Sequence, residues 1–381
     1  MGSGQHYVMG SRTGTRVTLN GREYLYFAGT SYFQLHAHPE LIRAANHATG
    51  EYGIGSATTR SMTGNTPLLE QVEKKLSAFF DSEDAVYLPS GYLSSLAGIQ
   101  ALRDLQRCQI IFLDEASHHS LVEGARASGL QVIPFRHRDA GDLEEKMRRH
   151  LDHEQHPLVA SDGLFPATAA LAPVKAYMDL ARQYRGMVWI DDAHCVGTLG
   201  ARGRGTREIR AIRSPGFYVG ATLSKAFGAY GGFICGDEDF IGTLRTGSVY
   251  SCSSAPMNAA VAASIRGIEL LQENPALRKK LWENARYLRE SLSHLGIKLE
   301  YPDIPSRHGC IPVASFMHGN ARSMRAVQHF LMERGIFIQH TFYNGSGKEG
   351  LLRVVVSSSH EKAEIDLLRE TLGEAMNHVS A

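Results

Sequence analysis

The sequence is poor in cysteine, in long apolar runs and in charge of one sign. Its 381 residues carry 40 Lys and Arg against 39 Asp and Glu, which gives a formal net charge of +1. This balance gives no support for a nucleic-acid-binding surface or a surface for acidic membranes. No apolar run approaches the roughly 20 residues needed to span a bilayer, and MGSGQHYVMG at the N-terminus lacks the apolar core of a signal peptide.

The cysteines and histidines do not form a recognisable disulfide or metal pattern. The five cysteines are far apart, odd in number and without a CxxC pair, at positions 108, 195, 235, 252 and 310. They indicate reduced thiols in a cytoplasmic protein. The 18 histidines include HAH at 36–38 and HH at 118–119, but no HExxH motif or Cys/His ligand spacing is present. We therefore expect no metal site.

The middle of the chain predicts an α/β fold. Short apolar runs rich in β-formers follow one another with helical stretches between most of them: DAVYLPSG, QIIFLDE, LQVIPF, PLVASDGLF, GMVWIDDAH, FYVGATLS and GGFICG. Strands that are apolar on both faces, with intervening helices, favour a mainly parallel sheet covered on both sides. We expect a seven-stranded sheet of this kind, with a smaller α+β domain at the C-terminal end.

Local signals predict three parts of the chain. Asn20-Gly21 suits a type I′ turn, so residues 16–27 are expected to form a hairpin. Apolar residues at helical spacing behind a proline predict a helix over 67–80. From about 257, helices are expected at 257–272, 276–296, 322–334 and 361–377, with strands near 311–317, 336–340 and 351–357. The predicted division is an N-terminal arm (1–45), a large domain (46–256) and a small C-terminal domain (257–381).

Polar residues gather at the carboxyl ends of the predicted strands, which is where ligands sit in such sheets. They are Ser90-Gly91, Asp114, Asp162, Asp191-Asp192-His194 and Thr222-Ser224-Lys225. LPSGYLSS (88–95) reads as a strand, a tight turn and a helix start, which together form an anion site. In WIDDAHCVGTLGARGRG (189–205), an acid buried at a strand end needs a positive partner, for which a protonated pyridine nitrogen is suitable.

Lys225 lies in YVGATLSKAFGAYGGFICG (218–236), with no carboxylate within ten residues on either side. It is either a solvent-exposed loop lysine or an amine with a covalent role. A phosphate-binding turn, an acid, histidines and such a lysine suit pyridoxal 5′-phosphate (PLP). The alternatives for the other residues are a strand-end cap for Asp191, a structural role for His118 and a surface position for Arg353.

These motifs are similar to those of the α-oxoamine synthase family of fold-type-I PLP enzymes. The resemblance covers nearly the whole chain and includes YGIGSATTRSMTGNTPLLEQVE (52–73), YSCSSAPMNAAVAASI (250–265) and LLRVVVSSSHEKAEIDLL (351–368). The order of the motifs and the 34 residues from Asp191 to Lys225 make the resemblance specific.

The resemblance implies a role for each matching residue. Lys225 is the Schiff-base and proton-transfer lysine, Asp191 pairs with the pyridine nitrogen, His194 bonds the ring 3′-oxygen and His118 stacks on the ring. The phosphate is held by the turn Ser90, Gly91 and Tyr92, by Thr222 and Ser224, and by a serine of 251–254 from a neighbouring subunit, for which Ser253 is the candidate. Arg353 grips the substrate carboxylate, with Ser31 on the substrate side.

The implied reaction is condensation of an amino acid with an acyl-CoA, which expels CoA and, in most of the family, CO₂, to give an α-amino ketone. The implied assembly is a homodimer with sites at the subunit interface. Two alternatives are different PLP chemistry, such as transamination, aldol cleavage or racemisation, and a non-catalytic partner subunit. The intact Lys225 argues against the latter.

Several positions depart from the family pattern. Ser31 stands where most members have asparagine, Leu69 where a histidine is usual and Pro166 where a serine usually lies near the cofactor. The glycine-rich segment at 55–60 reads GSATTR. The residues that hold PLP are kept while substrate-side residues differ, which favours an altered amino acid or acyl donor over a lost cofactor.

Overall fold

The computed structural model describes residues 6–152, 154–212, 215–301 and 309–380. The chain forms two compact units. The large unit comprises Pro39–Pro166 and Ala170–Pro275, and the small unit comprises the residues up to His38, Ala167–Ala169 and the residues from Ala276 onward. These boundaries differ from the three-part division derived from the sequence, which stays a prediction.

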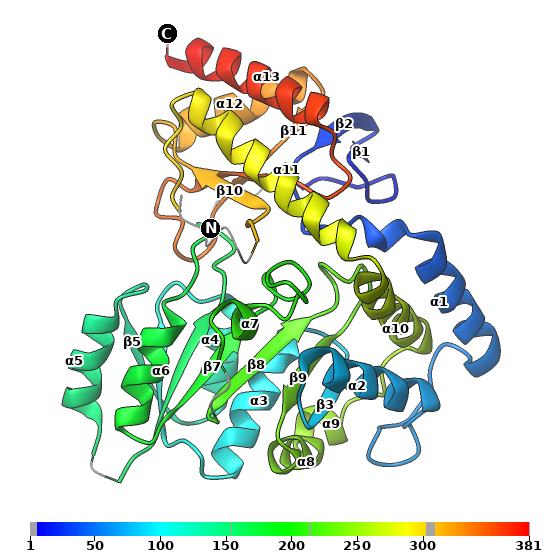
Figure 1. The fold of residues 1–381 in the computed structure, drawn as a ribbon, viewed down its shortest axis with the longest axis vertical. Helices are drawn as coiled ribbons and strands as arrows, with labels where there is room; N and C mark the ends of the chain where they lie inside the picture. Colours follow the sequence, from blue (N-terminus) through cyan, green and yellow to red (C-terminus); the bar gives the residue numbers. More distant parts are fainter. Residues whose placement is uncertain (1–5, 153, 213–214, 302–308, 381) are drawn as a thin grey trace. The chain divides into compact units, whose positions relative to one another are not determined.

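The large unit is built on one seven-stranded sheet in the order β3-β9-β8-β7-β6-β4-β5 (Figure 1). Its strands are β3 (Asp84–Leu88), β4 (Ile110–Asp114), β5 (Gln131–Phe135), β6 (Pro157–Asp162), β7 (Met187–Asp191), β8 (Phe217–Thr222) and β9 (Gly232–Gly236). All neighbouring pairs are parallel except those of β9, which runs antiparallel to both β3 and β8. The mainly parallel seven-stranded sheet predicted from the sequence is confirmed.

Helices cover both faces of this sheet. The helices of the large unit are α1 (Pro39–Tyr52), α2 (Pro67–Phe80), α3 (Tyr92–Asp104), α4 (His119–Ala127), α5 (Ala140–His150), α6 (Val174–Gln183), α7 (Thr206–Ile209), α8 (Glu238–Thr246), α9 (Ser248–Ser251) and α10 (Asn258–Glu273). Ile234 of β9 packs in a core cluster with residues of α3, α4 and α8. Its neighbour Phe233 points to the opposite face, where its ring lies 4.9 Å from that of Phe80 in α2.

The small unit contains two three-stranded sheets. The first, β1-β2-β11, joins β1 (Arg16–Leu19) and β2 (Arg22–Tyr26) to β11 (Ile336–Phe337). The second, β10-β13-β12, is made of β10 (Val313–Phe316), β13 (Leu351–Val355) and β12 (Gln339–Thr341). The helices are η1 (Leu35–Ala37), α11 (Pro275–His294), α12 (Ala321–Glu333) and α13 (Lys362–Ser380). Residues of α11, α12 and α13 form a common apolar core with the strands.

Local sequence signals predicted several elements closely. Asn20 and Gly21 both have positive φ (49° and 80°), as a type I′ turn requires, so the predicted hairpin is confirmed. Helix α2 has the predicted bounds, with Pro67 in its first turn and the Thr66 hydroxyl accepting the Leu69 N–H. Within the described residues, no helix has both the length and the hydropathy that a membrane crossing requires.

Candidate functional site

A cavity in the large unit opens at the carboxyl ends of β6, β7 and β8 and the N-terminal ends of α3 and α4. Its lining residues are Ser90, Gly91, Tyr92, His118, Ser120, Asp162, Leu164, Pro166, Asp191, Ala193, His194, Thr222, Ser224 and Lys225. Parallel strands end at the same edge of a sheet, so residues far apart in the sequence meet there. Nearly all the cofactor-side residues singled out from the sequence line this one cavity.

The Ser90-Gly91-Tyr92 turn forms one wall. It leads from β3 into α3, so the N-terminus of a 13-residue helix, with its partial positive charge, adjoins the cavity. A Cβ atom on Gly91 would lie 2.6 Å from the Thr222 Cβ and 2.8 Å from its Oγ1, so only glycine allows this close approach. The Thr222 Oγ1 lies 2.8 Å from the Ser224 Oγ. Hydroxyls and a helix terminus thus meet at one end of the cavity.

Asp191 is the last residue of β7 and is only 8% exposed. Its Oδ1 accepts the Ala193 N–H at 3.1 Å, and its Oδ2 accepts a hydrogen bond from the Ser120 hydroxyl at 3.4 Å. His194 follows three residues later, is also buried and lines the same cavity. A carboxylate and an imidazole are thus fixed by one strand end.

His118 is the N-cap of α4. Its Nδ1 accepts the Ser120 N–H at 3.2 Å and lies 2.7 Å from the Ser120 Oγ, so both groups fix the ring orientation. Burial lowers the pKa of His118, the Lys225 charge lowers it further and the Asp191 carboxylate opposes this shift. His118 is therefore a neutral ring at neutral pH, electrostatically linked to both the acid and the lysine of the cavity.

Asp162 and Ser120 line the cavity but had no predicted role. The sequence signal for Asp162 is its place at the end of a predicted strand, and the signal for Ser120 is its position two residues after His118. Asp162 Oδ2 accepts the His118 N–H at 3.0 Å. Burial raises the pKa of Asp162 well above its usual value, and the neighbouring Asp191 carboxylate raises it further. Asp162 thus ties β6 to the start of α4.

Two other strand-end acids lie outside the cavity lining. Asp114 Oδ1 binds His137 Nδ1 at 2.9 Å, and its Oδ2 accepts the Arg138 N–H at 2.9 Å. Asp192 accepts the Thr206 N–H at 2.8 Å and the Thr206 hydroxyl at 2.5 Å. Burial raises the pKa of Asp192 to about 6, although the Thr206 hydrogen bonds lower it. Both acids hold loops in place.

Three residues with predicted roles lie elsewhere. Ser253 does not line the cavity, and its hydroxyl donates to the Val249 carbonyl at 2.5 Å. Ser31, in the small unit, has its Oγ 2.6 Å from His36 Nδ1. Arg353 lies at the centre of β13, 4% exposed. Burial raises the pKa of Tyr26, and the Arg353 charge opposes that shift.

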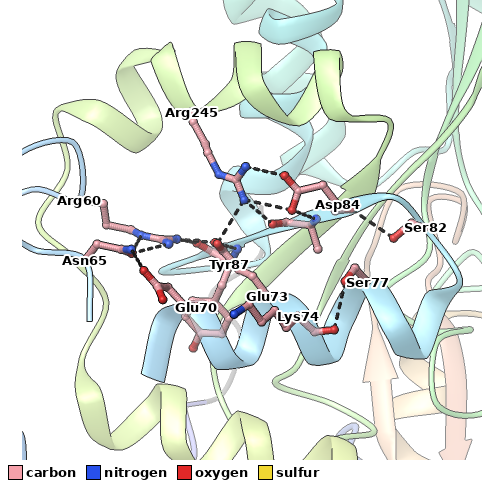
Figure 2. Close-up of polar contacts among 11 residues, drawn as sticks. Arg60, Asn65, Glu70, Glu73, Lys74, Ser77, Ser82, Asp84, Tyr87 and Arg245 are labelled. Carbon is pink, nitrogen blue, oxygen red and sulfur yellow. Dashed lines mark hydrogen bonds and ion pairs between the residues drawn. The ribbon is translucent and has the colours of Figure 1, made fainter. Parts of the chain in front are cut away.

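A buried ion-pair network supports the segment GSATTR and the start of β3 (Figure 2). The Glu73 carboxylate of α2 accepts hydrogen bonds from Arg60 at 2.5 Å, from Arg245 at 3.3 Å and from the Tyr87 N–H at 2.8 Å. Arg245 also donates to Asp84 at 2.5 Å. The departures at positions 55–60 thus occur in a segment whose Arg60 is fixed by buried contacts. Leu69, on the same helix as Glu73, is fully buried.

The donor set fits PLP. The helix N-terminus and the hydroxyls suit a phosphate, Asp191 suits a protonated ring nitrogen, the His118 ring suits an aromatic face, and Lys225 supplies the amine that binds an aldehyde. Within the described residues, no group of His, Cys, Asp or Glu side chains is arranged to hold a metal ion. The fold and this cavity define a PLP-dependent transferase of fold type I.

Comparison with known proteins places the chain more closely. A family model described as aminotransferase class I and II matches residues 22–372. The 8-amino-7-oxononanoate synthase of Thermoanaerobacter pseudethanolicus is 31% identical, covering 97% of this chain and 93% of its own length. The 8-amino-7-oxononanoate synthase of Trichlorobacter lovleyi is 34% identical, covering 93% and 89%.

Solved structures share the fold. The serine palmitoyltransferase of Sphingomonas wittichii superposes with a TM-score of 0.90 at 24% identity, covering 98% of this chain and 92% of its own. The 8-amino-7-oxononanoate synthase from Francisella tularensis gives a TM-score of 0.78 at 20% identity, covering 94% and 99%. The chain belongs to the aminotransferase class I and II family, and the resemblance to α-oxoamine synthases is confirmed.

Proposed function

We propose that the chain is a PLP-dependent acyltransferase of the α-oxoamine synthase type. It condenses an amino acid with an acyl-CoA: the amino acid loses its Cα proton, a bond forms between Cα and the thioester carbonyl carbon, and CoA leaves as the thiol. Loss of the carboxylate as CO₂ and return of a proton to Cα then give an α-amino ketone. The observation that carries this proposal is the joint placement of Lys225, Asp191, His118 and His194 in one cavity.

When bound, PLP supplies an electron sink for negative charge at Cα. Asp191 holds the proton of the ring nitrogen, and His194 donates to the ring oxygen. The Ser90–Tyr92 turn, together with Thr222 and Ser224, binds the phosphate. Lys225 Nζ would attach the cofactor, and the same amine would accept the Cα proton of the substrate. Lysine suits this task because desolvation shifts its pKa readily.

The substrate side of the proposal rests on the small unit. Arg353 binds the amino-acid carboxylate through its planar guanidinium, whose fork matches two carboxylate oxygens. Ser31 acts on the same substrate. The departures at Ser31, Leu69 and Pro166 support an amino acid or acyl group different from those usual in the family.

We also infer a cytoplasmic homodimer. Large apolar side chains are exposed at Tyr52, Ile54, Met62 and Met257. The Asn258 N–H donates to the Ile54 carbonyl at 3.2 Å, so these segments are neighbours in space. Large apolar side chains exposed on neighbouring segments mark an interaction site, and a second copy of the chain is the occupant that we propose for this exposed apolar patch. Ser253, in the adjoining segment, then contributes to the phosphate site of the partner.

The test is a combination of cofactor trapping and thiol release. Purified protein loaded with PLP is expected to show a visible absorption band, and borohydride is expected to fix the cofactor on Lys225, identified by peptide mass. Mixed with panels of amino acids and acyl-CoAs, it is expected to release CoA thiol only when both are present. Lys225→Ala is expected to abolish both signals, whereas Lys175→Ala, at an exposed position on α6, serves as the matched control.

The other outcomes have distinct meanings. Protein that stays colourless with added PLP would contradict any PLP chemistry. A coloured protein that forms keto acids without releasing thiol would be an aminotransferase. Failure of every acyl donor to give amino-acid-dependent thiol release would exclude the synthase.

A further inference from the structure

The sheet β10-β13-β12 of the small unit carries a row of polar residues across one face. Arg353 in β13 is the register partner of Ser315 in β10 and of Gln339 in β12. Directly paired residues of antiparallel strands point to the same face, with Cβ atoms about 5 Å apart. We name these three residues the polar row: Ser315, Arg353 and Gln339.

This row lies on the face opposite the apolar core. The neighbours Leu352 and Val354 in β13 belong to the core cluster of the small unit, as do Ala314 and Phe316 in β10. Because side chains alternate along a strand, Ser315 and Arg353 point away from that core. They are nevertheless only 1% and 4% exposed. Two members of the polar row, Ser315 and Arg353, are therefore buried polar groups, and Gln339 at the outer strand is half-buried.

Buried pairs flank the polar row, one of two valines and one of a leucine and a threonine. On the same face, Val313 pairs with Val355 on one side of it, and Leu351 pairs with Thr341 on the other. All four residues are buried. A guanidinium and a hydroxyl are thus placed together in surroundings of low polarity, where a hydrogen bond to a charged group is stronger than in water.

The Ser315 hydroxyl has no hydrogen-bond partner among the described residues. Buried hydroxyls are nearly always bonded, because one left without a partner loses its hydrogen bonds to water. The unsatisfied hydroxyl of Ser315 therefore points to a ligand atom that completes it. Because Ser315 lies beside Arg353, we expect this ligand atom to be a carboxylate oxygen. A carboxylate has about four lone-pair sites, and a bidentate guanidinium occupies two of them, so sites are left for the Ser315 hydroxyl.

We propose that Ser315 determines specificity for the substrate carboxylate. Its Oγ–H donates to a carboxylate oxygen held by Arg353, and the Gln339 amide, on the outer strand, supplies the third donor of the polar row. This inference rests on the proposed function, since it assigns a further residue to the amino acid that Arg353 binds. The site is one for an α-amino-acid carboxylate and discriminates against the neutral carboxamide.

The experiment measures binding to the PLP-loaded enzyme by calorimetry. The probes are glycine, L-alanine and L-serine, each compared with its carboxamide. For the amino acid that wild type binds best, Ser315→Ala is expected to raise the dissociation constant about tenfold, the effect of one hydrogen bond to a charged group. Binding of the carboxamide is expected to stay unchanged. In turnover, KM for the amino acid is expected to rise more than kcat falls.

Two further variants separate this role from a structural one. Ser315→Thr keeps the donor and is expected to restore binding to within a few-fold of wild type. Ser358→Ala removes another buried hydroxyl that lacks a partner within the described residues and lies outside the polar row, so it is expected to bind as wild type does. If Ser315→Ala does not fold, Ser315→Cys provides a similar shape with a weaker donor and the same expected direction.

The outcomes are distinguishable. Unchanged amino-acid binding in Ser315→Ala, or an equal loss for the carboxamide, would overturn the role of Ser315 while leaving the proposed function intact. An equal loss of amino-acid binding in Ser358→Ala would also overturn the role of Ser315, because it would show that removing any buried hydroxyl of this kind weakens binding. If PLP-loaded wild type binds none of the three amino acids while Lys225 still traps the cofactor, both the inference and the proposed carboxylate role of Arg353 fail.

Discussion

Asp162 and Asp191 are register partners on the neighbouring parallel strands β6 and β7, so two carboxyl groups lie side by side at one edge of the sheet. The pKa of Asp162 is raised well above its usual value, and burial is the main cause. Asp191 accepts hydrogen bonds from the Ala193 N–H and the Ser120 hydroxyl, which fix the orientation of its carboxylate toward the cavity. The two adjacent acids therefore have different surroundings, and burial disfavours a charge on Asp162.

This difference predicts opposite responses to the same substitution. Asp191→Asn is expected to lower turnover by about 100-fold or more, because the amide cannot hold the ring-nitrogen proton of PLP. Asp162→Asn keeps an oxygen that can accept the His118 backbone N–H and removes a carboxyl whose charge is disfavoured by burial, so it is expected to keep cofactor and most of the activity. PLP absorption and turnover measure both variants. Equal losses would contradict the assignment.

The buried Glu73 carboxylate predicts a loss of stability. Glu73→Gln leaves the buried Arg60 charge without its carboxylate, whereas Arg245 keeps Asp84, so the free energy of unfolding is expected to fall by about 3 kcal/mol. Denaturant unfolding of the variant measures this change. Glu123→Gln, in an exposed pair with Arg126, is the control and is expected to change stability by less than about 0.5 kcal/mol. The double variant Arg60→Met/Glu73→Leu is expected to recover part of the loss.

His360 predicts a pH dependence of stability in the small unit. Burial lowers the pKa of His360 from 6.5 to about 4, although the hydrogen bond between its Nε2 and the Tyr26 carbonyl opposes this shift. The folded state therefore binds this proton less readily than the unfolded state does. The stabilisation is present above pH 6.5 and is lost as the pH falls toward 4, by about 3 kcal/mol in total.

Unfolding of wild type and His360→Gln across this pH range checks the prediction. The variant is expected to show a flatter stability profile between pH 6.5 and 4, whereas His329→Gln, at an exposed position, is expected to follow wild type. Parallel profiles for wild type and His360→Gln would show that another group is responsible.

The exposed apolar patch predicts the oligomeric state. Sedimentation equilibrium of wild type is expected to give a dimer, and Ile54→Glu or Met62→Glu is expected to weaken it, because a charge would be buried at the interface. Leu367→Glu introduces the same charge on α13 of the small unit at a position 47% exposed, and it is expected to leave the dimer intact. A monomeric wild type would sink this proposal and the predicted role of Ser253.

The elements that the sequence predicted well are those whose signals lie within a few consecutive residues. The bounds of α2 followed from Pro67 and the apolar spacing, and the hairpin followed from Asn20-Gly21, because these signals lie within the element itself. The antiparallel direction of β9 was also open to inference, since it follows β8 without an intervening helix.

Long-range partners separated the acids in a way that the sequence could not show. Asp114 and Asp162 both end apolar strands and looked equivalent. Asp114 binds His137 and Tyr177, 23 and 63 residues later in the chain, and so became part of a structural cluster. Asp162 instead meets His118 and the cavity. The sequence likewise could not show that Ser315 pairs with Arg353 or that its hydroxyl lacks a partner among the described residues, because both facts depend on strand pairing.

Lys225 lies in the loop between β8 and β9, whereas Asp162 and Asp191 lie at the ends of paired strands. The Leu223 N–H donates to the Gly231 carbonyl at 2.9 Å and the Ala229 N–H to the Leu223 carbonyl at 3.0 Å, so the loop closes on itself. The closure of the loop is encoded within about twenty consecutive residues, whereas the Tyr87 and Ser264 hydroxyls bond the Tyr230 carbonyl from outside it. Transplanting residues 217–236 into another sheet edge would therefore carry the loop closure but leave these two supports, and the acids Asp191 and Asp162, behind.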